Sequence, residues 1–169
     1  GSELQAEMTL RGDADSLSLV VPAASLRGGS GDTLFSLSRF QYGQAKEGAP
    51  VVAGNLTTGG RGLPRIAGRM EERMGGGIAL DLTMAEYRAG EASLAMPEMI
   101  VLQRDDGVIG FSGEILASGP LPGGAVDNLR MPVSGDVAPS GALSMWRQCA
   151  EVHFDRLVFA EVNLARQKL

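Results

Sequence analysis

The chain has 169 residues, a length typical of one domain, and 44% of them are hydrophobic, which is enough to bury a core. Its formal net charge of −5 and its pI near 4.9 argue against nucleic acid as a partner and against docking on anionic lipid by charge alone. The 24 glycines indicate many turns, because average glycine usage would be about half of that share.

The N-terminal region begins with Gly1-Ser2, which are typical of residues left after removal of a tag. We exclude residues 1–2 and expect residues 3–169 to form a single all-β domain that is a fragment of a larger protein. Three apolar residues, Leu17, Leu19 and Val21, alternate with less apolar neighbours, which predicts a half-buried strand. The glycine-rich run 28–32 then predicts a plain turn.

The middle of the chain allows two interpretations. Apolar residues recur there at four-residue spacing, which is compatible with at most one short helix near 63–74: Ile66, Met70 and Met74. An irregular strand or loop fits the same residues equally well, because Gly68 weakens a helix. A clear strand pattern follows, in which alternate positions are apolar: Ile78, Leu80, Leu82 and Met84.

The C-terminal half continues with strand and turn signals. Asp106-Gly107 lies between two apolar runs and predicts a hairpin, and Gly123-Gly124 predicts another reversal. Three prolines each follow an apolar strand pattern directly: Pro22, Pro97 and Pro132. Since proline donates no ladder hydrogen bond, its recurrence favours a regular bend or an open edge.

These patterns favour an elongated, curved, mostly antiparallel sheet or a sandwich or groove over a closed barrel. Weak repeats near 14–64 and 90–122 share the order strand, proline, strand, turn, strand, and units of that kind stack. Chance similarity among short apolar strands is the alternative.

Catalytic and metal-binding patterns are not found in the sequence. It has one histidine, His153, and one cysteine, Cys149, without paired metal-ligand spacing or a nucleophile elbow. We therefore expect no enzyme activity, no catalytic residue, no metal site and no cofactor. We expect His153 to be a surface or otherwise satisfied residue and Cys149 to be a buried small hydrophobe.

Four segments resemble one family, the YdbH-type proteins of the AsmA-like group in bacterial envelopes, known historically as dicarboxylate transport proteins. The segments cover most of the span from about residue 87 to residue 160: 87–97, 111–124, 128–135 and 149–157. The resemblance implies a periplasmic β-sheet folded into a groove (a β-taco), in a parent protein anchored to the inner membrane. It also implies passage of phospholipid between the inner and outer membranes, and a partner for Cys149 beyond residue 169.

Together, pattern and resemblance favour a non-enzymatic lipid-binding or lipid-conduit module. The expected partners are phospholipid or another acyl lipid, the rest of the parent chain and other envelope proteins, but not nucleic acid. Nine residues are expected to line the apolar groove: Leu17, Leu19, Val21, Ile78, Leu80, Leu82, Met84, Leu94 and Met96. The alternative is a passive structural or protein-binding β-domain, a β-helix or sandwich in which these residues form a closed core.

Overall fold

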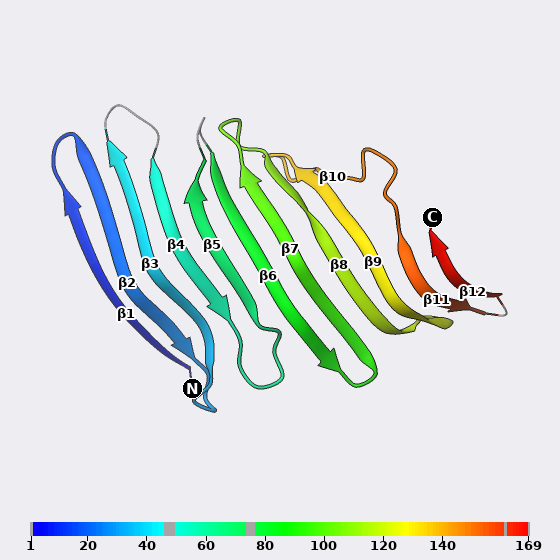
Figure 1. Cartoon of the computed structure of the whole chain (residues 1–169). Helices are drawn as coiled ribbons and strands as arrows, with labels where there is room; N and C mark the ends of the chain where they lie inside the picture. The colour runs from blue at the N-terminus through cyan, green and yellow to red at the C-terminus, as the bar shows by residue number, and fades with distance from the viewer. Residues whose placement is uncertain (1, 46–49, 74–76, 161, 169) are drawn as a thin grey trace.

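The structure, a computed structural model, describes residues 2–45, 50–73, 77–160 and 162–168. These residues form strands and turns and no helix, as Figure 1 shows. The twelve strands are β1 (Glu3–Gly12), β2 (Ser16–Arg27), β3 (Thr33–Ala45), β4 (Val51–Thr58), β5 (Ile66–Glu72), β6 (Ile78–Ala89), β7 (Ala92–Gln103), β8 (Ile109–Leu121), β9 (Gly124–Val137), β10 (Leu143–Met145), β11 (His153–Phe159) and β12 (Val162–Lys168). The predicted all-β, elongated and antiparallel architecture is confirmed.

The topology is a meander in which each strand pairs with the next one in the chain. The one departure lies beside β9, whose outer edge is shared by β10 and β11. β10 pairs with residues 135–137, and β11 pairs with residues 124–130. The sheet does not close on itself, so β1 and β12 lie at opposite edges (Figure 1).

The predicted turns lie between strands. Residues 28–32 connect β2 and β3, and Gly107 donates its backbone N–H to Arg104 O at 2.9 Å between β7 and β8. Gly107 and Gly123 both have positive φ angles, of 78° and 81°, which L-residues with a side chain rarely adopt. Residues 74–76, which comprise Met74 of the short helix considered near 63–74 and two glycines, lie outside the described residues.

The short helix considered near 63–74 is not formed, since residues 66–72 are strand β5. A spacing of four places Ile66 and Met70 on one side of a strand as well as on one side of a helix, so the spacing does not distinguish the two structures. The strands on either side of β5 favour the strand. A Cβ built on Gly68 would lie 2.8 Å from Leu82 Cδ2 and 2.9 Å from Leu56 Cγ, on the two strands flanking β5.

Two of the three prolines mark bulges inside strands rather than strand ends. Pro22 lies in β2 where the register with β1 shifts between Glu7 and Thr9, and Pro97 lies in β7 where the register with β8 shifts between Ala95 and Glu98. A bulge places two residues opposite one, which bends the sheet. The expected bend is therefore present, but the strands continue past it.

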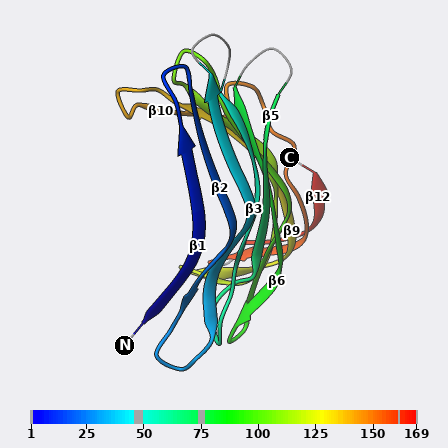
Figure 2. The same ribbon diagram turned by 90° about the vertical axis from the view of Figure 1, so that its left-hand side faces the viewer.

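Bulges near the middle of several strands accompany a pronounced curvature. Further register shifts occur between β3 and β4, where Arg39 has a φ of 52°, and between β8 and β9, where Asn128 has a φ of 52°. Figure 2 shows the strands bowed along their length, so that one side of the sheet is hollow. The hollow runs across the strands, from β1 toward β12.

Candidate functional site

The register divides the sheet into two chemically different faces. Direct partners on adjacent strands share a face, and side chains alternate along each strand. Leu56 pairs with Leu37 on one side and with Gly68 on the other, and Gly68 pairs with Leu82. Following such pairs through the sheet defines an apolar face.

All nine residues expected to line a groove lie on the apolar face. In β2, Leu19 pairs with Tyr42 of β3. In β6 and β7, Leu80 pairs with Met70, Met84 pairs with Met96, and Leu94 pairs with Tyr87. The register therefore places side chains from two separate segments, residues 17–21 and 78–96, on the same face of the sheet, with β3, β4 and β5 between them.

The same face contains apolar residues that the sequence reasoning did not single out. They come mainly from β3, β4, β7, β8 and β9: Phe35, Leu37, Phe40, Tyr42, Val52, Leu56, Met99, Val101, Phe111, Val133. Period-2 alternation runs through Phe35 and Leu37, and through Val52 and Leu56, so the signal was present in the sequence. It is less regular there, because glycines occupy part of the face and the Arg39 bulge shifts the alternation.

The apolar face lines the hollow side of the sheet. In Figure 1, β7 runs upward and β8 lies on its right. The backbone N–H of Arg104, which follows β7 directly, points to the right, because it donates to Val108 O at 2.9 Å just before β8. In an upward-running strand, an L-residue whose N–H points to the right projects its side chain toward the viewer. Gln103, the preceding residue, pairs with Ile78 of the apolar face, so this face points away from the viewer and into the hollow of Figure 2.

The apolar side chains pack sideways on one another, and no second layer of described residues covers them. Four of the buried apolar side chains in the described residues are placed on this face by the register: Val21, Val52, Met84 and Val133. Others remain open, such as Leu10 at 65% exposure and Leu94 at 42%. The apolar side chains thus contact one another substantially, but no described residue covers the surface of the layer that faces the hollow.

The accessible surface of the chain reflects this single layer. It amounts to 11,320 Å² for 17.6 kDa, whereas a globular monomer of that mass exposes about 7,900 Å². No described polar side-chain atom is buried without a partner. The excess surface is therefore that of a sheet lacking a covering layer.

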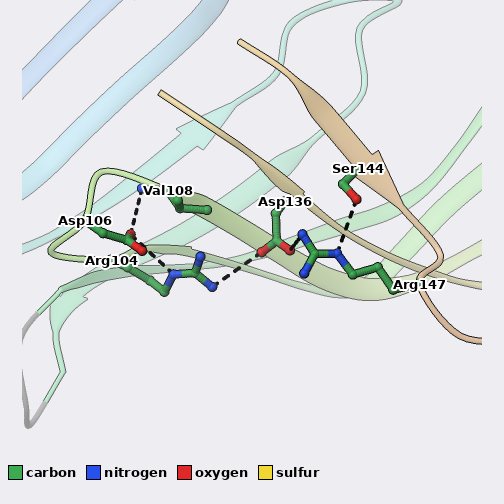
Figure 3. A network of polar contacts seen from close by, with 6 residues as sticks. All are labelled: Arg104, Asp106, Val108, Asp136, Ser144 and Arg147. Atoms are coloured by element: carbon green, nitrogen blue, oxygen red, sulfur yellow. Dashed lines mark hydrogen bonds and ion pairs between the residues drawn. The ribbon is translucent and has the colours of Figure 1, made fainter. Parts of the chain in front are cut away.

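The polar face carries ion pairs and hydroxyl groups instead. Its best-connected group lies at one end of β7, β8 and β9, where Asp136 lies between two guanidinium groups (Figure 3). Asp136 is 3.6 Å from Arg104 Nη1 and 3.2 Å from Arg147 Nη2, and Arg147 Nε donates to Ser144 Oγ at 3.2 Å. The group fastens β10 and the segment after it to the main sheet.

The strand ends form two rims along the hollow, which differ in charge. The upper rim in Figure 1 contains the described turns 13–15 and 104–108, which carry one arginine, Arg104, and four aspartates: Asp13, Asp15, Asp105 and Asp106. The lower rim contains the turns 28–32, 59–65 and 90–91, with two arginines, Arg61 and Arg65, beside Asp32 and Glu91.

The pKa values of two upper-rim aspartates are lowered by local hydrogen bonds. Asp13 accepts the backbone N–H of Asp15 at 2.9 Å, which holds its pKa below the usual value of 3.8. Asp106 accepts the backbone N–H of Val108 at 3.0 Å, with a further contribution from Arg104, and its pKa is also lowered. Both carboxyl groups are therefore charged at neutral pH.

Cys149 and His153 lie at the surface near the gap between β10 and β11. The expectation that Cys149 is a buried small hydrophobe is wrong, because its side chain is exposed in the segment between these strands. His153 is exposed on the polar face, with Nε2 3.8 Å from Glu151 Oε2. Among the described residues, no cluster of three or more His, Cys, Asp or Glu could hold a metal ion.

Comparisons with protein-family models, with curated proteins and with solved structures found no match to this chain. In the part of the chain that the structure describes, no helix could cross a membrane. The physical features of the hollow face and its rims are therefore the basis for the functional argument.

Proposed function

We propose that this protein is a non-enzymatic lipid-binding module whose hollow apolar face holds acyl chains and allows lipid to move along it. The observation that carries the proposal is the continuous apolar lining from β1 to β9 without a covering layer of described residues. Water is a poor solvent for such a surface, and covering it with acyl chains is worth about 25 cal/mol per Å² of apolar area removed from water.

The dimensions of the sheet suit a conduit better than a closed pocket. Eleven strands lie side by side in the main path, and neighbouring strands are about 4.8 Å apart, so the hollow extends for roughly 50 Å. The lining consists of flexible methionine, leucine and aromatic side chains rather than a few directed polar groups. A lining of this kind favours any acyl chain over a unique ligand and places no strong barrier along the path.

The proposal extends to the cellular setting implied by the YdbH-type resemblance. We propose that the module belongs to an AsmA-like envelope protein and lies in the periplasm, in a parent chain anchored to the inner membrane. In that setting, phospholipid would pass along the hollow between the two membranes, with head groups at the open side. The rest of the parent chain and other envelope proteins would be its protein partners.

The direct test is the lipid content of the purified chain. We expect phospholipid to co-purify with the wild-type protein and to be detected by mass spectrometry after organic extraction. Leu94→Asp places a charge on the apolar face at a side chain that is already 42% exposed, so the fold tolerates it while acyl binding falls. Ser93→Asp, one residue earlier and on the polar face, is the matched control and should retain lipid.

A folded wild-type protein that never carries lipid would contradict the proposal. Equal lipid content in Leu94→Asp and Ser93→Asp would contradict it as well, because the two variants differ only in which face receives the charge. Circular dichroism of both variants verifies that the sheet is intact.

The alternative, a passive structural or protein-binding β-domain, was expected to have the filled interior of a sandwich or β-helix. The described residues form one open layer without such an interior. A protein-binding role would have to use the same hollow face. It therefore predicts co-purifying protein in place of lipid in the extraction experiment.

A further inference from the structure

The loop between β4 and β5, residues 59–65, has three features that occur together nowhere else on the described lower rim. It extends beyond the strand ends at the lower rim in Figure 1. It carries Arg61 and Arg65, neither of which has an ion pair or side-chain hydrogen bond with a described residue. Between them, Leu63 is 49% exposed.

The loop is held in a defined conformation. Leu63 N donates to Gly60 O at 3.3 Å to close a turn, and Gly60 and Gly62 have φ angles of 116° and 75°. Tyr87 Oη donates to Gly62 O at 2.7 Å, which fastens the loop to β6. The two arginines are therefore presented by an ordered loop, so that less conformational freedom is lost when they bind a ligand.

The loop lies at the edge of the sheet, between a cationic pocket on the outer face and the apolar face. The shallow pocket, of about 710 Å³, is lined by both arginines together with hydroxyl groups and backbone, and it opens beside Ala67 and Thr83 of the outer face. Its lining includes Asp32, Thr33, Thr57, Thr58, Arg61 and Arg65, with a net charge of +1. On the other side of the loop, Tyr87 pairs with Leu94, which belongs to the hollow face.

A cationic pocket beside an apolar surface fits an amphiphile with an anionic head. Guanidinium groups bind phosphate oxygens with two parallel hydrogen bonds, and threonine hydroxyls can donate further ones. The described turns 13–15 and 104–108 of the opposite rim carry four aspartates and one arginine, Arg104, which is already paired with Asp106 and Asp136, so these turns repel phosphate. The two rims would therefore give a bound lipid one preferred orientation across the hollow.

We propose that the loop 59–65 is a head-group site, at which Arg61 and Arg65 bind the phosphate of a phospholipid while its acyl chains pass over Leu63, Tyr87 and Leu94 into the hollow. The inference rests on the proposed lipid-binding function and adds a binding site for the phosphate and a fixed orientation of the bound lipid. Tyr87 is a positioning residue, since it acts through Gly62.

The test compares the binding of two lipids with identical acyl chains to the delipidated 169-residue chain. Fluorescently labelled phosphatidylglycerol carries the phosphate, and the corresponding diacylglycerol does not. For the wild-type protein, we expect phosphatidylglycerol to bind at least about tenfold more tightly at low salt, as two cations near one phosphate would provide. The preference should shrink as salt is raised.

The double variant Arg61→Gln/Arg65→Gln should lose this preference and bind diacylglycerol as the wild type does. The double variant Arg11→Gln/Arg69→Gln makes the same change in net charge at exposed positions outside the pocket, and it should keep the preference. Equal loss in both double variants would overturn the site, because it would show only an effect of net charge.

Further outcomes separate this site from the groove. Equal binding of both lipids by the wild type overturns the rim site and leaves the groove intact. Displacement of phosphatidylglycerol by inorganic phosphate at low millimolar concentration would show a site for the free anion and overturn the assignment to a lipid. Binding of neither lipid overturns the groove, and the rim site with it.

Discussion

The two faces of this sheet share one backbone and differ in almost everything else. On the hollow face, Leu80, Leu82 and Met84 from β6 meet apolar partners on both neighbouring strands. On the outer face, the intervening Asp81 and Thr83 are set among charged and polar groups, and Arg73 Nη2 is 3.5 Å from Asp81 Oδ1. Soluble sheets of this kind normally cover the apolar face with a second layer.

This difference between the two faces indicates that the hollow face is the one available to a partner. The outer face has ion pairs and hydrogen bonds of its own, including the group around Asp136 in Figure 3. The side chains of the hollow face contact only their neighbours within the layer, and no described residues cover their ends. Four experiments follow, each designed to break or sharpen this contrast.

The largest effect is expected from the adjacent pair Leu82→Asp and Thr83→Asp. Leu82 covers Gly68 beside it, so its replacement removes apolar packing and places a charge in the hollow. We expect a loss of about 2 to 5 kcal/mol in the free energy of unfolding, together with loss of bound lipid. Thr83→Asp on the outer face should change stability by less than about 0.5 kcal/mol, as measured by urea unfolding.

The second comparison uses two glycines and concerns how closely the strands approach. A Cβ on Gly113, on the hollow face, would collide with the backbone of β7 at Glu98 O and lie 2.8 Å from Met99 Cα. Gly113→Ala should therefore destabilise the sheet by about 1 to 3 kcal/mol.

The control for that comparison is Gly43→Ala on the outer face. There the nearest atom, Val51 Cβ, is 3.9 Å away, which is an ordinary contact. A small gain of about 0.4 to 1 kcal/mol is expected, because alanine restricts the unfolded chain. If thermal unfolding ranked the two variants in the opposite order, the assignment of the close contact in β8 would be wrong.

A smaller effect is expected at the rim loop. Tyr87→Phe removes the hydrogen bond to Gly62 O and keeps the ring on the hollow face. The cost should be about 0.5 to 1.5 kcal/mol of stability, and amide exchange should accelerate in residues 60–63 while the centre of β6 stays protected. Uniform acceleration along β6 would mean that the tyrosine supports the whole strand rather than the loop.

The smallest effect concerns the upper rim and pH. The backbone N–H of Val108 lowers the pKa of Asp106, so the folded state binds a proton less readily than the unfolded chain. The resulting stability is present above the unfolded pKa of 3.8 and is lost as pH falls through the lower folded value.

The measurement is the midpoint of thermal unfolding between about pH 5 and pH 2. Asp106→Asn cannot titrate, so its midpoint should fall slightly less than that of the wild type on acidification. Parallel curves for the two proteins would show that the hydrogen bond does not distinguish the folded state.

The alternation of side chains was the part of the fold that could be predicted. Positions 17–21 and 78–84 alternate between apolar and less apolar residues, with Val20 and Ala79 as exceptions, and the register places the apolar residues of both sets on one face. The conformation of residues 63–74 could not be predicted, because Ile66 and Met70 satisfy both periods and only Leu56 and Leu82, from adjacent strands, decide between them. Proline positions indicated bends correctly, but Pro22 and Pro97 lie at bulges that depend on the partner strand.

The rim loop could not be found from sequence for a similar reason. Arg61 and Arg65 have no local pattern that distinguishes them from other surface arginines. Their significance depends on which turns share an edge of the sheet and on Tyr87, 25 residues from its partner Gly62. The exposure of Cys149 also depended on tertiary context, since the segment 146–152 leaves the edge of β9 between two short strands.

The meander order has a consequence for how such a molecule can vary in size. Because every hairpin contacts only its immediate neighbours, inserting one hairpin would lengthen the channel by about 10 Å and leave its cross-section unchanged. Deleting one would shorten it by the same step. The length of the hollow and its cross-section are therefore separate properties of this architecture. The number of hairpins determines the length, and the length and bend of each strand determine the cross-section.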